Sequence, residues 1–355
     1  MILDESVKLG NSSGKKSILI NSLQYIFFGL LGGFLCYMAF KDQNSSQLLV
    51  SLKEVNYWWV VPIFIISLFN SLIRSLRWLM LIKTLGYRPG VTKAFSALMI
   101  GYMVNYAVPR MGEITRCIVL KKSGHIPFEG TFGTVITERI IDIISLFLVC
   151  ILTLLIAYKE IYKFVYDNIF IPIGQSIQLL GESILWLLPF IVIVTCAVLV
   201  ILWVFRKKIL AFLYQKKIRK IISDVWKGIA SVRYVENKGM FILYTLLIWF
   251  NYFLVTYIWF FAMDNMTGLN MKTGLVMTTL GSIGKSLPIQ GGGVGAYHYI
   301  ITQAGLIFGV SELNGNTLAI INHGFQTIFQ IGFGLIGFLL IAKNIKVLPG
   351  NTRQD

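Results

Sequence analysis

Charged residues are scarce in this sequence. Only 14% of its 355 residues are charged, whereas 56% are hydrophobic. Soluble domains carry roughly 25% charged residues, so this scarcity excludes an ordinary soluble protein and predicts an integral membrane protein. The net charge of +16 comes from basic loops that flank apolar runs. Charge in such places sets orientation and attracts anionic lipid, so we expect no nucleic-acid partner.

Cysteine and histidine are also sparse. The four cysteines are scattered singly and there are three histidines, so neither a disulfide framework nor a metal site is indicated. The sequence contains no GxxxxGK[ST] motif, so we expect no cofactor and a driving force that is a gradient or downhill flow. Residues 1–16 are polar and precede an apolar run long enough to be an anchor, so no cleaved signal peptide is expected.

Long apolar runs are abundant. A membrane-spanning helix needs about 20 apolar residues. On this criterion we predict about six full spans, at roughly 18–40, 57–82, 131–157, 184–205, 241–263 and 317–342.

Two further apolar stretches are interrupted, and we call them the first broken segment (about 93–122) and the second broken segment (about 274–309). Each begins as an apolar helix too short to cross a membrane and then breaks at a proline, Pro109 or Pro288, with glycine close behind. Interrupted apolar segments at matching places in two halves of a chain are typical of transporter binding sites.

Loop charge indicates how these segments lie in the membrane. Loops 41–56 and 158–183 are close to neutral, whereas 83–93, 110–122, 206–240 and the C-terminal tail are basic. If each broken segment enters the membrane and returns to the same side, every basic loop is cytoplasmic, as the positive-inside rule requires. Both termini are then cytoplasmic. A complete crossing by either segment would place several basic loops on the wrong side.

The predicted fold is therefore an all-α polytopic membrane protein with two re-entrant broken-helix segments. Residues 57–157 and 241–342 form two inverted repeats within a single transmembrane domain, 1–355. The basic stretch 206–240 joins them, either as an amphipathic helix on the cytoplasmic leaflet or as a solvated linker.

The two break points are predicted to face each other near the bilayer midplane. A re-entrant helix of about 12 residues reaches about 18 Å, which places Asn105 and Lys285 at similar depth from opposite sides. The return helices are expected to begin at Arg110–Glu113 and Gly291–Gly295, with N-termini that favour an anion. The glycines either allow a phosphate to approach or serve tight turns and close packing. A lysine near the bilayer centre is costly unless it is paired or functional.

A group of charged residues forms a second candidate site. Glu138 and Asp142 share one helix face, and Arg74 and Arg77 lie at similar depth on another span. We predict a network of these residues with Arg139. The alternatives are a purely structural ion-pair cluster and arginines that extend to the inner headgroups.

Other candidates have simple structural explanations as well. Glu113 is suited to capping a return helix, and Arg116 follows it. His298 and His323 lie in apolar helical stretches, where a lone histidine is more often a packing residue than a ligand. The candidate substrate-binding residues are Arg74, Arg77, Asn105, Arg110, Glu113, Arg116, Glu138, Arg139, Asp142, Lys285, Gln290, Gly292, Gly293, His298 and His323. No catalytic residue or metal ligand is predicted.

Four motifs carry a resemblance to a known family. RSLRW at 74–78, NYAVPRMGEITR at 105–116, TERIID at 137–142 and PIQGGGVGAYH at 288–298 resemble the membrane domain of lysylphosphatidylglycerol synthases and related flippase-like proteins. The resemblance implies translocation or binding of a lipid at the bacterial inner membrane. Because the chain ends soon after its last span, we expect no synthase domain and no tRNA-dependent chemistry.

The sequence therefore predicts a lipid translocase that is not an enzyme. Its partner would be a membrane lipid, either an anionic or aminoacylated phospholipid or a polyprenyl phosphate, with a homo-oligomer or an envelope-biosynthesis protein as a further partner. One alternative is an intramembrane transferase that uses Glu113 or Glu138 as general base, although no metal-binding carboxylate cluster or nucleophile–base pair supports it. Another is a non-catalytic subunit of an envelope glycan pathway.

Overall fold

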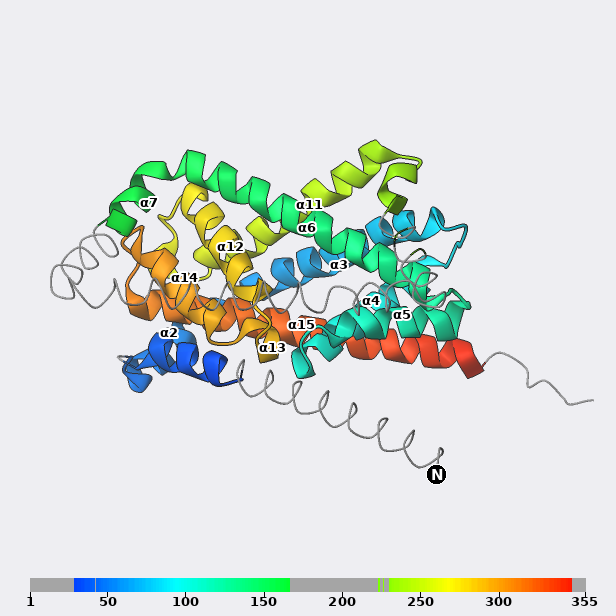
Figure 1. Ribbon diagram of the computed structural model, residues 1–355. Helices are drawn as coiled ribbons and strands as arrows, with labels where there is room; N and C mark the ends of the chain where they lie inside the picture. Colours follow the sequence, from blue (N-terminus) through cyan, green and yellow to red (C-terminus); the bar gives the residue numbers. More distant parts are fainter. Residues whose placement is uncertain (1–28, 42, 167–222, 224–225, 227–229, 347–355) are drawn as a thin grey trace, which may run out of the picture. The chain divides into compact units, whose positions relative to one another are not determined.

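The computed structural model describes residues 29–41, 43–166, 223, 226 and 230–346 (Figure 1). Every regular element within these residues is helical. The α-helices are α2 (Ser45–Glu54), α3 (Val60–Lys83), α4 (Val91–Ala107), α5 (Met111–Gly124), α6 (Phe128–Ile156), α7 (Tyr158–Val165), α11 (Lys238–Phe261), α12 (Met271–Ser286), α13 (Gln290–Gly293), α14 (Ala296–Leu306) and α15 (Glu312–Lys346). Short 3-10 turns lie at Tyr57–Trp59, Ser231–Tyr234 and Asp264–Met266.

The chain divides into two compact units. Unit 1 comprises Met1–Leu79, Pro89–His125 and Lys238–Asp355, and unit 2 comprises Met80–Arg88 and Ile126–Asn237. Both broken segments therefore belong to unit 1, together with α11 and α15. Unit 2 holds α6 and α7.

Four predicted spans are confirmed as long apolar helices. Among the described residues, the helices with the length and hydropathy to cross a membrane are Tyr57–Lys83, Phe128–Ile156, Lys238–Phe261 and Glu312–Ala342. The predicted span 18–40 is described only from residue 29 on, as the short apolar helix Gly29–Phe40. The span 184–205 and most of the connector 206–240 lie outside the described residues.

Two predicted loops are wrong in part, because each contains a short helix. Within 41–56, Asn44 caps α2 by accepting a hydrogen bond from the Ser46 amide at 3.0 Å. The stretch 158–183 begins with α7. Both helices are too short and too polar to stand out from a loop in a hydropathy pattern.

Helix α15 begins earlier than the predicted 317 because a polar residue in its first turns is satisfied inside unit 1. Asn316 is buried, its Nδ2 donates to the Ala39 carbonyl at 3.0 Å, and its Oδ1 accepts from Thr302 at 2.7 Å. Buried polar groups are tolerated when they are hydrogen-bonded in this way.

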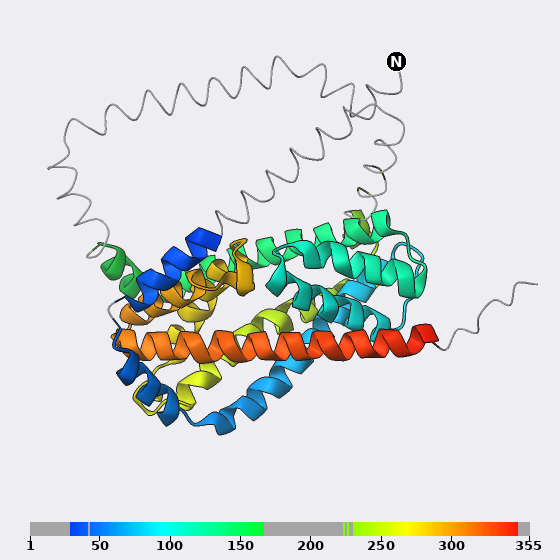
Figure 2. The ribbon, with the colours of Figure 1, turned by 90° about the horizontal axis from the view of Figure 1, so that it is seen from below.

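Helix α4 packs along the C-terminal half of α15 (Figure 2). Small residues allow the close approach: a Cβ placed on Gly337 would lie 3.0 Å from Ser96 Cα, and one on Gly334 would lie 2.5 Å from Met103 Cβ. Glycine at such contacts is typical of helix packing in membranes. From its N-terminus to its C-terminus, α4 therefore runs from the C-terminal end of α15 toward the middle of α15.

Helix α14 packs along the other half of α15 (Figure 2). A Cβ on Gly315, near the start of α15, would lie 3.0 Å from Thr302 Cα. Helix α12 lies against α14, because a Cβ on Gly281 would lie 2.9 Å from both Ile301 and Tyr297 side chains. The second broken segment thus packs against the N-terminal half of α15, and the first broken segment packs against the C-terminal half.

Candidate functional site

The first broken segment divides at Pro109. Helix α4 ends at Ala107, α5 begins at Met111, and Arg110 between them has a φ of 65°. Proline has no amide hydrogen and cannot continue a helix, and a positive φ is unusual for a residue with a Cβ. The Arg110 side chain is exposed and forms no hydrogen bond or ion pair with the described residues. The break therefore presents a guanidinium at its surface.

The turn is closed by Asn105. Its Oδ1 accepts a hydrogen bond from the Gly112 amide at 2.6 Å, which satisfies one of the free amides at the start of α5. Helix α5 then runs back beside α4. The two helices are in close contact, since a Cβ on Gly101 would lie only 2.8 Å from the Gly112 carbonyl oxygen. Asn105, a predicted binding residue, therefore acts in this structure as a cap.

Two further candidates lie on α5. Glu113 is half-buried in the first turn of the helix. Arg116 is only 2% exposed, and its guanidinium carbon lies 4.7 Å from the centre of the Trp78 ring. A guanidinium at this distance from an aromatic face is held by a cation–π interaction. Arg116 thus packs inside unit 1.

The second broken segment divides at Pro288. Helix α12 ends at Ser286, and α14 begins only at Ala296. The sequence predicts a return helix that begins within Gly291–Gly295, and the last of these residues, Gly295, is the N-cap of α14. Three of these glycines, Gly291 to Gly293, have φ values of 66°, 71° and 90°, and such left-handed conformations form a turn that glycine adopts without steric cost. Gln290 opens this turn, and its side chain lies outside the described residues.

Protein atoms occupy the space beside two candidate glycines. A Cβ on Gly292 would lie 2.7 Å from Tyr106 Cε1, and one on Gly293 would lie 3.0 Å from the Gly284 carbonyl oxygen. Close packing accounts for both residues. The interpretation that these glycines admit a phosphate stays a prediction.

The two break points meet at the middle of α15. Tyr106, from the first broken segment, lies against Gly292 and close to the Thr327 side chain of α15. The Gly292 carbonyl is 3.3 Å from His323 Nε2. Thr327 is halfway along the apolar span Glu312–Ala342. The breaks of two segments far apart in sequence therefore lie together beside the centre of a long apolar helix.

A closed polar cluster surrounds Lys285 near this point. The Lys285 ammonium donates to Gln326 Oε1 and lies 4.3 Å from the centre of the Tyr297 ring. Gln326 Nε2 donates to Asn322 Oδ1 at 2.6 Å, and Asn322 Nδ2 donates to the Tyr297 hydroxyl at 2.6 Å. We call these four residues the Lys285 cluster. Helices α12, α14 and α15 each contribute to it.

The two candidate histidines lie beside the Lys285 cluster. The rings of His298 and His323 are 5.2 Å apart, and the His323 ring is 5.4 Å from that of Tyr297. His298 Nδ1 accepts from the Gly295 amide at 3.4 Å. Both histidines are buried. His323, on α15, contacts the Gly292 carbonyl of the glycine turn, whereas His298 caps the start of its own helix, α14, through the Gly295 amide.

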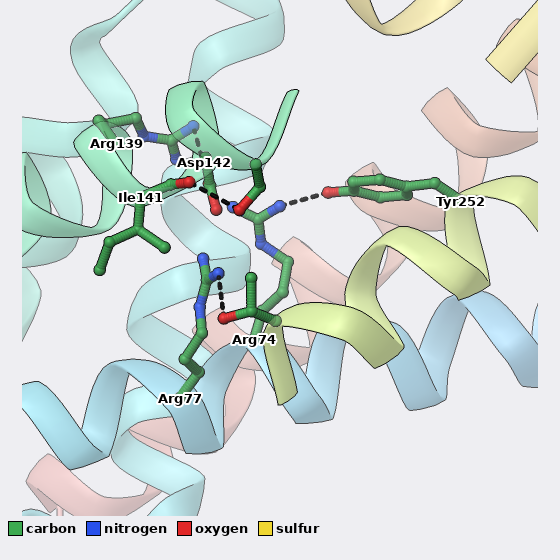
Figure 3. A network of polar contacts seen from close by, with 8 residues as sticks. Arg74, Arg77, Arg139, Ile141, Asp142 and Tyr252 are labelled. Atoms are coloured by element: carbon green, nitrogen blue, oxygen red, sulfur yellow. Dashed lines mark hydrogen bonds and ion pairs between the residues drawn. The ribbon is translucent and has the colours of Figure 1, made fainter. Parts of the chain in front are cut away.

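The candidate arginines of α3 lie against α11 in unit 1 (Figure 3). Arg74 donates to the Tyr252 hydroxyl, and Arg77 Nη1 donates to Thr245 Oγ1 at 3.3 Å. Both arginines are buried. Neutral hydroxyls of the same unit therefore satisfy part of their hydrogen-bonding capacity.

The acidic candidates belong to α6 in unit 2. Glu138 is fully buried, and Arg139 Nη1 lies 4.0 Å from Asp142 Oδ2 (Figure 3). That contact joins residues three apart on one helix. The prediction that these residues and the α3 arginines form a single network stays a prediction, because they belong to different units.

Sequence reasoning missed the neutral partners of Lys285. Asn322 and Gln326 are four residues apart, and both are polar within an apolar span. Polar residues at this spacing share a helix face, which is the signal that identifies them in retrospect.

Comparison with known proteins places these features in a family. The family model described as the lysylphosphatidylglycerol synthase TM region matches residues 23–334, which include all four motifs. UPF0104 membrane protein MJ1595 of Methanocaldococcus jannaschii is 30% identical over 130 residues, which are 36% of either chain. UPF0104 membrane protein MJ1078 of the same organism is 22% identical over 255 residues, 70% of this chain and 99% of that relative. The match thus spans about a third of the first relative's length. No solved structure matches the chain.

Proposed function

The chain belongs to the lysylphosphatidylglycerol synthase TM-region family, and we propose that it is a translocase that moves a phosphate-containing lipid across the membrane. Its multi-pass membrane location follows from the family and from its long apolar helices. We also propose that the protein lies in the bacterial inner membrane and that it leaves the lipid chemically unchanged. That the lipid contains a phosphate is likewise part of the proposal.

One observation carries the proposal: the two broken segments approach α15 from opposite ends and meet at its middle. The apolar span Glu312–Ala342 has 31 residues, and at 1.5 Å per residue it is about 46 Å long, enough to cross a bilayer with its ends outside the hydrocarbon. A meeting point beside Thr327 would then lie near the midplane. Broken helices that meet at this depth are the arrangement by which secondary transporters form their sites.

The same arrangement supports the two inverted repeats. If the basic end of α15, with Lys343 and Lys346, is cytoplasmic, then α4 and α5 enter from the cytoplasmic side. Helices α12 and α14 lie along the other half of α15 and enter from the outside. Irregular backbone at such depth survives only where protein or water satisfies its polar groups, as the Asn105 and His323 contacts do here.

Two cations are the proposed phosphate ligands. Arg110 is exposed at the first break, and Lys285 lies near the second. An ionisable residue within the membrane is expensive and is a functional candidate by default. The lipid tails would remain in the bilayer while the headgroup passes these two residues.

The experiment is lipid translocation in reconstituted vesicles. Purified protein is inserted into liposomes that contain a trace of fluorescent phosphatidylglycerol or fluorescent prenyl phosphate, and a membrane-impermeant quencher is added. We expect the protein to make inner-leaflet label accessible, and Lys285→Met to slow this at least about tenfold, as loss of a charged ligand does. Lys272→Met, at the start of the same helix, is the control and should transport normally.

Lipid analysis of the same vesicles separates translocation from the rival functions. Mass spectrometry should find the probe lipid chemically unchanged. A modified lipid would contradict the proposal in favour of an intramembrane transferase. Translocation that remains absent for both probes until an envelope-biosynthesis protein is added would contradict it in favour of a subunit role.

A further inference from the structure

Neutral groups alone hold the ammonium of Lys285. Its hydrogen-bond acceptor is the amide oxygen of Gln326, and its other contact is the face of the Tyr297 ring. Gln326 and Tyr297 are joined through Asn322, so the ring of contacts closes without an acidic member. The cluster therefore carries one positive charge and no negative charge.

No carboxylate of unit 1 compensates this charge among the described residues. Glu54 ends α2, Asp264 lies in the turn after α11 and Glu312 begins α15, while Glu113 lies on α5. None of the four forms an ion pair with Lys285. The neighbouring imidazoles of His298 and His323 cannot supply negative charge.

The ammonium of Lys285 is half-buried, and amide and ring dipoles compensate its charge incompletely. Removing such an ion even partly from water is costly, and a negative partner is what recovers this cost. A charge-assisted hydrogen bond to an anionic oxygen is roughly twice as strong as one to a neutral amide oxygen. An anion that reaches Lys285 would therefore displace Gln326 Oε1, because it offers the same acceptor geometry together with the missing charge.

From this composition we infer that the Lys285 cluster selects a lipid whose phosphate bears no attached ammonium group. The phosphate oxygen accepts from Lys285 in place of Gln326, and the released amide remains hydrogen-bonded to Asn322. A headgroup with an aminoacyl ammonium would bring a second cation toward Lys285, where the cluster has no carboxylate to receive it. Two positive charges brought into contact repel each other strongly where water is scarce, because the local dielectric constant is low.

The inference rests on the proposed function and narrows its substrate class. Of the phosphate-containing lipids considered above, it retains the anionic phosphodiester of phosphatidylglycerol and the phosphomonoester of a prenyl phosphate. It excludes an aminoacylated phospholipid such as lysylphosphatidylglycerol. The shared chemistry is a lipid-borne phosphate with a net negative charge.

The test is equilibrium binding to the full chain in detergent, measured by native mass spectrometry. The probes are phosphatidylglycerol, prenyl phosphate, phosphatidylcholine, lysylphosphatidylglycerol and free glycerol 3-phosphate. We expect either anionic lipid to bind at least about tenfold more tightly than phosphatidylcholine or lysylphosphatidylglycerol. The tighter of the two anionic lipids identifies the phosphate class, and free glycerol phosphate should bind far more weakly than either.

Variants then attribute the preference to the cluster. Lys285→Met should abolish the preference for anionic lipid, Lys285→Arg should retain most of it, and Lys272→Met should leave it unchanged. Equal or tighter binding of lysylphosphatidylglycerol, or an unchanged preference in Lys285→Met, would overturn the inference. Free glycerol phosphate that binds as tightly as the lipids would also overturn it.

Failure of the inference is distinguishable from failure of the proposed function. Vesicles that translocate lysylphosphatidylglycerol and phosphatidylglycerol equally would reject the selectivity while supporting translocation. Anionic preference in binding without translocation of any lipid would retain the anion site and reject the translocase.

Discussion

The ring of Tyr106 fills the space in which Gly292 would carry a side chain. Tyr106 Cε1 lies 2.7 Å from the position of a Cβ on Gly292, whose φ is +71°. One residue comes from the last turn of α4 and the other from the glycine turn before α14. This contact joins the two broken segments at their tips.

Gly292→Ala should therefore destabilise unit 1 for two reasons. The alanine methyl collides with Tyr106, and its backbone is strained at positive φ. Overpacking of this kind costs about 1–3 kcal/mol. Thermal unfolding in detergent, followed by loss of the monodisperse chromatographic peak, measures the effect.

Gly309→Ala is the matched control. Gly309 has a φ of +74°, but no atom lies within 4 Å of its added Cβ, so only the strain remains. Tyr106→Leu should relieve the clash, so that Gly292→Ala costs less in that background than in the parent. Equal losses in Gly292→Ala and Gly309→Ala would show that the Tyr106 contact contributes nothing.

The Asn105 cap leads to a second prediction. Asn105→Ala leaves the Gly112 amide without its acceptor, and removal of such a cap costs about 1 kcal/mol or more when the amide is buried. Asn44→Ala removes a comparable cap from α2 at an exposed site, where water replaces it, and should cost less. Unfolding temperatures of the two variants should differ in that order, and the reverse order would contradict the capping role.

The long spans and both break points could be predicted from the sequence. Helices α3, α6, α11 and α15 differ from the predicted spans by a few residues at each end, because a run of apolar residues and a membrane thickness determine them. The prolines at 109 and 288 locate the breaks, because proline cannot continue a helix.

The contacts at the break points could not be predicted in the same way. Lys285 and Gln326 are 41 residues apart, and nothing local links them. The start of α14 at Ala296 depends on left-handed glycines, which hydropathy does not distinguish from a helix N-terminus. Asn105 could be recognised as a polar residue at the tip, but its use as a cap depends on how closely α5 folds back.

Packing of α4 on α15 gives a third prediction. A Cβ on Gly334 would lie 2.5 Å from Met103 Cβ and 3.0 Å from the Met99 carbonyl oxygen, so Gly334→Ala should force the helices apart and lower the unfolding temperature. Gly332 is two residues earlier on the same helix, and nothing lies within 4 Å of its added Cβ. Gly332→Ala should stabilise by about 0.5–1 kcal/mol, because alanine favours a helix interior. Opposite signs for the two variants are the expected result, and a decrease in both would contradict this packing.

The backbone of Arg110 gives a fourth prediction. A residue with a Cβ in the left-handed region costs about 1–2 kcal/mol, so Arg110→Gly should raise the unfolding temperature. The same change removes the exposed guanidinium at the first break, so translocation in vesicles should fall. Stability and activity should therefore move in opposite directions.

His125→Gly is the control for Arg110→Gly. His125 has a φ of 53° at the end of α5, so glycine relieves similar strain there without removing a charge from the break. Its stability should rise and its translocation should remain normal. Normal translocation in Arg110→Gly would remove Arg110 from the proposed phosphate ligands.

Gln326→Glu gives the last prediction, because it supplies internally the negative charge that the Lys285 cluster lacks. One oxygen of the new carboxylate would take the place of the amide oxygen that already accepts from the Lys285 ammonium. The other would replace Gln326 Nε2, which donates to Asn322 Oδ1, so the Asn322 amide must flip to donate to it. An ion pair that compensates this half-buried ammonium should raise the unfolding temperature, and it should also compete with any anion for the ammonium. We therefore expect binding of anionic lipid to weaken by at least about tenfold while the protein becomes more stable.

Gln330→Glu is the control for an added carboxylate as such. Gln330 lies one turn further along α15, is half-buried and has no hydrogen-bond partner among the described residues. Anionic-lipid binding that is unchanged in Gln326→Glu would mean that the anion does not replace Gln326 at Lys285.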